Sequence, residues 1–246
     1  MDTVLLIDSC TDLPRSYVEE KKIPFVSLTC NFRDQEYKDD FGKTLDYKEF
    51  YAAVRNGEMP STSQVNVYEY TEIFKRCAME GKALVYLGFS SGLSGSVSSA
   101  NLARDMVCEE IKDADITVID SKCASLGEGL LAYQANEMLE SGASKDEIVS
   151  WIETNKLRVN HWFTVDDLGH LKRGGRLSGA AAFVGTLLDI KPILKVDDEG
   201  RLIPVSKVKG RKKSIKTLFE MLKENIEYPE GQVIAISHGD CIEDAE

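Results

Sequence analysis

The sequence predicts an α/β fold in which an N-terminal parallel-sheet βαβ domain is followed by a C-terminal α+β domain. Over the first 158 residues, short apolar runs alternate with segments of helical periodicity, which is typical of right-handed βαβ units. Beyond residue 158 the alternation gives way to a β-hairpin pattern. The chain has 246 residues, of which 43% are hydrophobic, so each domain can bury a core. We therefore expect domains at 1–158 and 159–246.

In the first domain, each apolar run predicts a strand and each periodic segment predicts a helix. One helix starts at 12–14, with Asp12 as its cap. The expected strands are 4–7, 23–30, 83–87 and 116–119, and the other expected helices are 45–54, 67–79, 96–107, 125–139 and 144–157.

In the second domain, 191–208 reads as a hairpin that turns at Asp197-Asp-Glu-Gly200. A small-residue helix is expected at 179–188. The remaining expected elements are strands at 159–165 and 232–237 and an amphipathic helix at 211–226.

The charge distribution excludes some classes of partner. The formal net charge is −11, which argues against general affinity for nucleic acid or anionic membranes. Residues 172–216 hold twelve Lys/Arg and four Asp/Glu, so this segment is +8 while the rest of the chain is −19. Such asymmetry indicates either a local surface for an anion or partner, or a solvated basic face.

Several absences in the sequence point to a reduced cytoplasmic protein. The start, Met1-Asp2-Thr3, has no basic region of a signal peptide, and no apolar run approaches a membrane span, so we expect no stable membrane insertion. The six cysteines are widely spaced without a C-x-x-C pair and read as free thiols. The three histidines form no H-x-x-H pattern, and no metal site is expected.

Hydroxyl-rich segments suggest where a ligand binds. Three expected strands end in Ser: Asp8-Ser9, Phe89-Ser-Ser91 and Asp120-Ser121. Ligands of parallel sheets collect at the carboxyl ends of the strands. Ser61-Thr-Ser-Gln64 also stands where a helix is expected to begin, so hydroxyls and backbone N–H groups could cradle a carboxylate. Taken singly, Ser61, Thr62 and Ser94 are better explained as helix caps than as ligand-binding residues.

Two other motifs carry possible chemistry. Gly88-Phe-Ser-Ser-Gly92 fits the G-x-S-x-G pattern of a nucleophile elbow, with Ser90 as nucleophile and His161, His170 or His238 as base. This is the alternative function, a serine esterase or acyl hydrolase. Lys172-Arg-Gly-Gly-Arg176 combines basic side chains with two glycines, which lets backbone and guanidinium approach an anion; a plain basic turn explains it as well.

Taken together, ordered motifs along nearly the whole chain resemble the DegV family of bacterial fatty-acid-binding proteins. The resemblance implies two α/β domains with one long-chain fatty acid between them, and no cofactor. The matching segments are Ile7-Asp-Ser9, Thr11-Asp-Leu-Pro14, Pro60-Ser-Thr-Ser-Gln64, Ser90-Ser-Gly-Leu-Ser-Gly95, Val118-Ile-Asp-Ser121, Ala124-Ser-Leu-Gly127, Leu171-Lys-Arg-Gly-Gly-Arg-Leu177 and Lys191-Pro-Ile-Leu194.

The resemblance also implies a biological role. In many Gram-positive bacteria such proteins are the lipid-presenting subunit of a fatty acid kinase, whose separate catalytic subunit phosphorylates the bound carboxyl for phospholipid synthesis. By this resemblance the chain is a binding subunit without its own catalysis.

Site residues follow by the same resemblance. Thr62 and Ser94 would hydrogen-bond the fatty-acid carboxylate, and Arg173 and His238 would lie toward the carboxylate or the kinase. Family members usually continue past the Ser-His-Gly strand, so the second domain is expected to be shortened at its C-terminus. Further candidates for the carboxylate or kinase-facing side are Ser61, Ser63 and Ser91.

Overall fold

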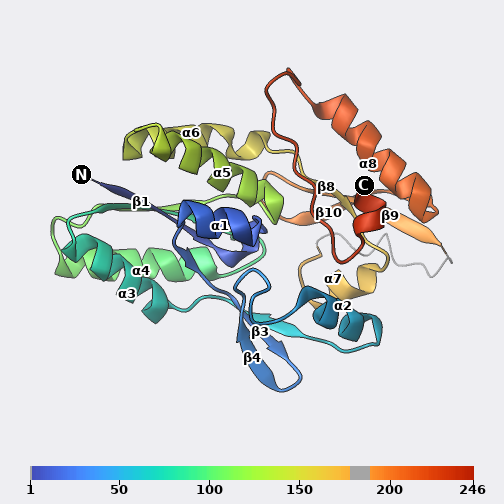
Figure 1. Ribbon diagram of the computed structural model, residues 1–246, viewed down its shortest axis with the longest axis horizontal. Coiled ribbons are helices and arrows are strands. Elements are labelled where there is room, and N and C mark those ends of the chain that lie inside the picture. The colour runs from blue at the N-terminus through green and yellow to red at the C-terminus, as the bar shows by residue number, and fades with distance from the viewer. Residues whose placement is uncertain (1, 178–188) are drawn as a thin grey trace.

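A four-stranded parallel sheet lies at the centre of the first part of the chain (Figure 1). The computed structural model describes residues 2–177 and 189–246. The strand order is β2-β1-β6-β7, and all neighbouring strands run parallel, as the sequence predicts. The strands are β1 (Thr3–Asp8), β2 (Phe25–Val26), β6 (Ala83–Gly88) and β7 (Ile116–Asp120).

Helices cover both faces of this sheet. Leu5 and Ile7 of β1 pack with one group of helices, whereas Leu6 between them packs with the other. This two-residue alternation is that of a strand buried on both faces. One face carries α1 (Arg15–Lys21), α5 (Leu126–Glu140) and α6 (Lys145–Asn155), and the other carries α3 (Val67–Met79) and α4 (Ser96–Glu110).

The prediction of a single strand at 23–30 is wrong, because the chain divides there between two sheets. The N–H of Leu28 donates to Ser9 Oγ at 3.1 Å and the Leu28 carbonyl accepts from Asp39 N at 2.8 Å. These bonds turn the backbone out of β2. It continues in a separate antiparallel sheet of order β4-β3-β5, made of β3 (Thr29–Phe32), β4 (Gln35–Lys38) and β5 (Ser61–Ser63), next to α2 (Tyr47–Arg55).

Two predicted helix starts are also corrected. Asp12 closes a short 3-10 helix, Ser9–Thr11, with a left-handed φ of 51°, and α1 begins only after Pro14. Ser61 to Ser63 form strand β5 and do not stand at a helix N-terminus. The N-cap of α3 is Asn66, whose side chain accepts a hydrogen bond from Glu69 N. An Asn side chain directly ahead of a helix can reach a backbone N–H of the first turn that has no partner within the helix.

The second part of the chain contains an antiparallel sheet of order β10-β9-β8. Its hairpin turns at 197–200, as predicted, and Gly200 takes a φ of +74°. The elements are a 3-10 turn (Lys156–Arg158), β8 (Trp162–Thr164), α7 (Leu168–Arg173), β9 (Ile190–Val196), β10 (Leu202–Lys209), α8 (Arg211–Asn225) and α9 (Ile242–Ala245).

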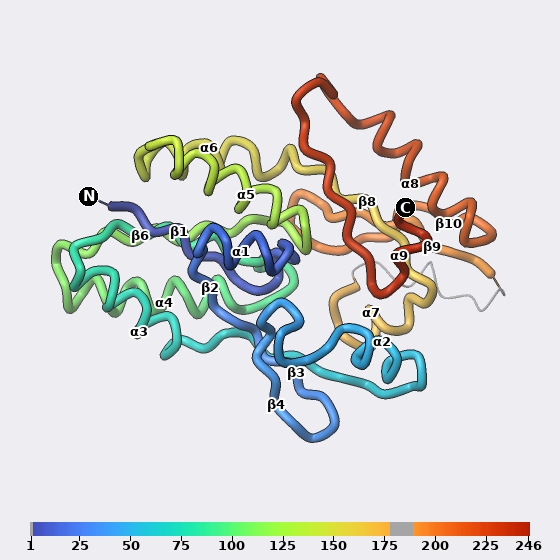
Figure 2. Tube along the Cα trace, viewed as in Figure 1, coloured from blue at the N-terminus to red at the C-terminus, as the bar shows by residue number. Residues whose placement is uncertain are grey.

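The prediction of a last strand at 232–237 is wrong. After α8 the chain runs without regular structure back towards α2 and α5 (Figure 2). Val233, Ile234 and Ile236 are more than half exposed, and no strand of the described chain pairs with them. A strand forms only with a pairing partner. The predicted helix at 179–188 lies outside the described residues.

Within residues 2–177 and 189–246, no helix is both long and apolar enough to cross a membrane.

Candidate ligand-binding site

The loops that follow β1, β6 and β7 meet at the carboxyl ends of these strands, and Asp8 joins two of them. Its carboxylate accepts from Cys10 N, Phe89 N and Tyr86 Oη, each at 2.9 Å. Asp8 is fully buried. Burial raises the pKa of its carboxyl, against the opposing effect of the hydrogen bonds from Phe89, Cys10 and Tyr86. Asp8 thus fixes the loop after β6 relative to β1.

The loop after β6 is a tight turn directly ahead of α4. The Ser90 N–H donates to Cys123 O at 3.1 Å, and the Ser90 carbonyl accepts from Leu93 N and Ser94 N at 3.0 Å. Ser94 Oγ then accepts from Ser96 N at 3.2 Å, and Ser96 is the first residue of α4. Ser94 therefore stands at a helix N-terminus, where unpaired N–H groups favour an anion.

Thr62 approaches the same edge from β5. Its backbone pairs with Cys30, its side chain is exposed, and its hydroxyl has no hydrogen-bond partner among the described residues. Two residues on, the Gln64 amide packs against Gly95, where any Cβ would overlap it. Gln64 Nε2 also donates to Ser99 Oγ at 3.0 Å. The Gln64 contact thus joins the Thr62 strand to the Ser94 loop.

The hydroxyls of two neighbouring serines, Ser63 and Ser91, are already engaged. Ser91 Oγ accepts from Lys122 Nζ at 3.1 Å, and Ser91 N donates to Asp120 Oδ1 at 3.1 Å. Ser63 Oγ accepts from Asn31 Nδ2 at 3.4 Å, and Ser61 pairs through its backbone in β5. Ser61 and Thr62 are both exposed, and the hydroxyl of each has no hydrogen-bond partner among the described residues.

The basic motif reaches the Ser94 loop through a different arginine from the one expected. Arg173, at the end of α7, faces Asp167 at 4.0 Å. Arg176 Nε donates to the Leu93 carbonyl at 3.2 Å. Gly175, with a φ of +72°, turns the chain between the two arginines. The motif contains both arginines, and the sequence alone does not show that Arg176, rather than Arg173, contacts the Ser94 loop.

His238 lies in the C-terminal segment, which also comes to this edge. Its Nδ1 accepts from Cys241 N at 3.1 Å, and the preceding Ser237 Oγ lies 3.0 Å from Ser125 Oγ. Ser125 is the N-cap of α5 and has a φ of 51°, a strained value for a residue other than glycine. Sequence reasoning did not single out Ser125, although it belongs to one of the matching motifs.

The sequence offered His161 only as a possible base for Ser90 in the esterase alternative, and the structure places it against the start of α5. Its ring packs on Gly127, where a Cβ would overlap it. The Ala124 N–H donates to Nε2 at 3.5 Å, and Nδ1 lies 3.1 Å from the Val159 carbonyl. Burial lowers the pKa of His161 to about 4, so the ring is neutral and donates from Nδ1.

The geometry argues against Ser90 as a nucleophile. The residue is fully buried, and its Oγ donates to Gly200 O at 2.8 Å while accepting from Gly92 N at 3.1 Å. No histidine side chain in the described residues hydrogen-bonds to it. The G-x-S-x-G match therefore reflects a structural serine, because the hydroxyl holds two backbones together.

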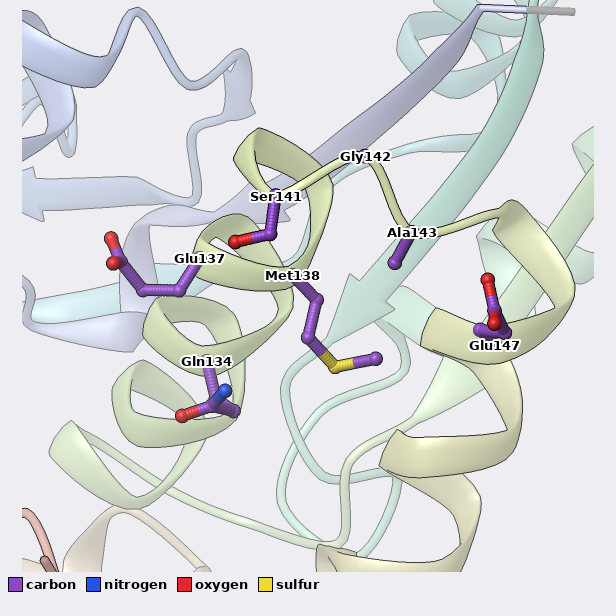
Figure 3. Close-up of a pocket in the computed structure, with 7 residues that line it drawn as sticks. All are labelled: Gln134, Glu137, Met138, Ser141, Gly142, Ala143 and Glu147. Atoms are coloured by element: carbon purple, nitrogen blue, oxygen red, sulfur yellow. The ribbon is translucent and has the colours of Figure 1, made fainter.

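A surface hollow between α5 and α6 lies away from these loops (Figure 3). It is lined by the C-terminal half of α5, the turn after it and the first turn of α6. Lys145 in that first turn pairs with Asp115, which directly precedes β7, so the hollow lies near the amino end of β7, away from the loops at the carboxyl ends of the strands. Its charged lining residues are the acidic Glu137 and Glu147, which do not favour a carboxylate ligand. The other lining residues are Gln134, Met138, Ser141, Gly142 and Ala143.

In the described part of the chain, no group of three or more His, Cys, Asp or Glu residues is placed to hold a metal ion.

Comparison with known proteins identifies relatives along the entire sequence. The profile of a family described as "Uncharacterised protein, DegV family" matches residues 2–246. A DegV domain-containing protein of Clostridium perfringens is 49% identical over 243 residues, which cover 99% of this chain and 84% of that protein.

Solved structures share the fold as well. A DegV family protein from Thermus thermophilus, described by its fatty acid binding, has a TM-score of 0.80 and 31% identity, covering 93% of this chain and 79% of that one. A DegV family protein from Ruminococcus gnavus, refined with vaccenic acid, has a TM-score of 0.89 and 25% identity, covering 100% of this chain and 86% of that one. The predicted α/β fold is confirmed.

Proposed function

Because this chain belongs to the DegV family, we propose that it binds one long-chain fatty acid and presents the carboxylate to a separate kinase subunit. The observation that carries the proposal is the similarity, over 93% of the chain, to a DegV protein described by its fatty acid binding. The structure with vaccenic acid supports the same ligand class. In this proposal the chain itself catalyses nothing, and the fatty acid is its only ligand.

We assign the carboxylate to Thr62 and Ser94. Thr62 has an unengaged hydroxyl on exposed β5, Ser94 stands at the N-terminus of α4, and the contact between Gln64 and Gly95 brings these two segments together. Hydroxyl and backbone donors stabilise a carboxylate without adding a fixed positive charge, so the ligand remains free to react.

Burial of the acyl chain supplies enough free energy for useful affinity. Each buried methylene contributes roughly 0.8 kcal/mol, so an acyl chain of about sixteen carbons could contribute on the order of 12 kcal/mol. Association costs about 4–15 kcal/mol. We place the acyl chain between the part up to residue 158 and the part from 159 onward, which we propose to be two domains.

The ligand is tested directly by native mass spectrometry of the purified protein. We expect one fatty acid per chain, and a protein that neither carries nor takes up a fatty acid would contradict the proposal.

Thr62→Ala and Ser94→Ala should each weaken fatty acid binding roughly 10- to 100-fold, the range for a hydrogen bond to a charged group. Ser98→Ala, on the exposed side of α4, is the matched control; equal affinity of all three variants would move the headgroup site elsewhere.

We propose further that the basic segment 172–216 helps to dock the kinase subunit or its phosphate-bearing substrate. The segment carries a net +8 in a chain of −11, and opposite charge steers association. Arg211 is engaged by Asp244 at 2.8 Å and by Asp166 at 3.9 Å. Three exposed lysines at the start of α8 are therefore better docking candidates: Lys212, Lys213 and Lys216.

Charge reversal tests whether the three α8 lysines dock the kinase subunit or only form a solvated surface. Replacing these three lysines by Glu should lower the rate of acyl-phosphate formation by the kinase while fatty acid binding is unchanged. The control reverses three exposed lysines outside the segment, Lys22, Lys48 and Lys112. Equal rates for the two triple variants would show that the α8 lysines are not a docking surface.

The free cysteines support the cellular setting that we propose. All six are unpaired, and Cys77 and Cys123 are buried. Unpaired thiols are typical of a reducing compartment. We therefore propose that the protein works in the bacterial cytoplasm and supplies acyl phosphate for phospholipid synthesis.

A further inference from the structure

The loop that carries Ser94 is held from the far end of the chain. Ser90 Oγ donates to the carbonyl of Gly200 at 2.8 Å, across a sequence separation of 110 residues. Ser90 is fully buried. A buried hydroxyl–carbonyl bond is costly to break, because each group would lose its partner without regaining water.

Two glycines allow this contact. A Cβ on Gly92 would lie 2.8 Å from Gly200 O and 2.9 Å from Glu199 O, which is too close for any side chain. A Cβ on Gly200 would overlap Ser90 Oγ, and Gly200 also has a φ of +74°. The two backbones therefore meet only because both positions lack a side chain.

The hairpin turn is rigid enough to act as a support. Asp197 Oδ1 accepts from Glu199 N at 3.0 Å and from Arg201 N at 2.8 Å. The Asp197 carbonyl accepts from Gly200 N at 2.8 Å. The Gly200 carbonyl is thus held by a network within the turn, independently of Ser90.

The contact between Ser90 and Gly200 also constrains Ser94, because Ser90 and Ser94 are hydrogen-bonded to each other. The Ser90 carbonyl accepts the N–H of Ser94 at 3.0 Å, so a displacement of Ser90 moves Ser94. Arg176, also from the second part of the chain, holds the Leu93 carbonyl at 3.2 Å. Two groups from beyond residue 158 therefore fix the loop just ahead of α4.

We propose that Ser90 and Gly200 form a clamp that positions Ser94 for the ligand carboxylate, so that the β9–β10 turn sets the affinity for the headgroup. This inference rests on the proposed fatty acid binding. Ser90 and Gly200 are positioning residues: they touch the loop and not the ligand. Ser90, the serine of the G-x-S-x-G motif, thus acts through Ser94. The protein distinguishes a fatty acid from an uncharged lipid of the same length only when the β9–β10 turn contacts Ser90.

The test compares two ligands that differ only in the headgroup. Affinity for hexadecanoate and for hexadecanol is measured by isothermal titration of delipidated full-length protein, with both lipids delivered from cyclodextrin. We expect Ser90→Ala to weaken hexadecanoate binding roughly 5- to 20-fold and to leave hexadecanol binding within twofold. Ser98→Ala, on exposed α4 surface, should change neither affinity.

A second variant guards against a folding defect in Ser90→Ala. Gly92 is exposed, so Gly92→Ala tests the clamp by displacing the turn without opening the core. We expect the same selective loss, and the double variant Ser90→Ala/Gly92→Ala should lose little more than either single variant, because both changes break one contact. Thermal melting confirms that each variant is folded.

The outcomes separate the clamp from the proposed function. If the wild-type protein binds neither lipid, the fatty acid proposal fails and the clamp fails with it. If the wild type prefers hexadecanoate and the folded variants keep that preference, the clamp alone is wrong. An equal loss for both lipids would also overturn it, because the contact would then be merely structural.

Discussion

Glu128 is a buried acid with no partner in the described structure. It lies in the first turn of α5, is fully buried, and neither carboxylate oxygen has a hydrogen-bond partner among the described residues. Burial raises the pKa of Glu128 well above its usual value, and the nearby Asp8, Asp12 and Asp120 raise it further. Burial without a partner therefore favours the neutral, protonated form of the Glu128 carboxyl.

An unpaired polar group at this position should cost stability. Glu128→Met, which keeps the size and removes the polar atoms, is expected to raise the free energy of unfolding by about 1–2 kcal/mol. Urea denaturation at pH 7 measures the change, with exposed Glu109→Met as the control. A loss of stability relative to wild type would mean that Glu128 makes a favourable contact that the structure does not describe.

His161 predicts a pH dependence of stability. Its pKa is lowered by burial from 6.5 to about 4, so below pH 6.5 the unfolded chain binds a proton that the folded chain excludes. The stabilising contribution of the neutral ring is therefore present above pH 6.5 and is lost as the pH falls towards 4. The slope is at most about 1.4 kcal/mol per pH unit.

The measurement compares wild type with His161→Gln. We expect the stability difference to shrink between pH 6.5 and 4.5, in urea titrations at each pH. Asp39 acts in the opposite direction, because burial raises its pKa from 3.8 to about 6 and the folded state holds its proton more tightly. Since both proteins contain Asp39, its contribution cancels in the difference; a difference that does not vary with pH would contradict a buried neutral His161.

At the scale of elements, α6 has the best-defined start. Ser144 Oγ accepts from Glu147 N, and Glu147 accepts from the Ser144 N–H at 2.8 Å, which makes a capping box. Ser144→Ala should lower the free energy of unfolding by about 1 kcal/mol and the melting temperature by roughly 2–4 °C. Ser150→Ala, exposed on the same helix, should leave the melting temperature unchanged; an equal drop in both variants would rule out a capping effect.

The success of the sequence prediction depends on how local the signal is. The helix at 67–79 and the hairpin turn at 197–200 are confirmed, because periodicity and turn residues in those segments determine the structure. The segment 232–237 has an equally strong apolar run but forms no strand. Its strand would need hydrogen bonds from another segment, and a propensity does not supply a partner.

The same reasoning applies to the site. Ser94 could be predicted at a helix start because the Gly/Ser loop directly precedes the apolar repeat of α4. The contacts of Ser90 with Gly200 and of Arg176 with Leu93 join residues 110 and 83 positions apart. No local pattern encodes such distant contacts, so the G-x-S-x-G match also fitted an esterase.

At the scale of the molecule, the C-terminal segment packs back against α2, which is far from it in the sequence (Figure 2). Arg55 of α2 pairs with Asp240 at 2.7 Å and donates to the Asp240 carbonyl at 2.9 Å. Gly239 packs against the Tyr51 ring, where a Cβ would lie 3.1 Å away. These contacts, with that of Ser237 on Ser125, hold an otherwise irregular segment in place.

Loss of the Arg55 contacts should therefore loosen the segment and leave the core intact. In Arg55→Met, we expect amide hydrogen exchange to accelerate several-fold at 237–241, while exchange in β6 and α3 is unchanged. Local opening of a segment depends on its own few contacts rather than on the global free energy of unfolding, and a partly exposed ion pair contributes only about 0.2–1 kcal/mol.

The matched control is Arg15→Met, which removes an exposed ion pair with Glu19 in α1. Acceleration throughout the parallel sheet would indicate that the segment stabilises the whole fold, and no change at 237–241 would indicate that Ser237 and Gly239 hold it without Arg55.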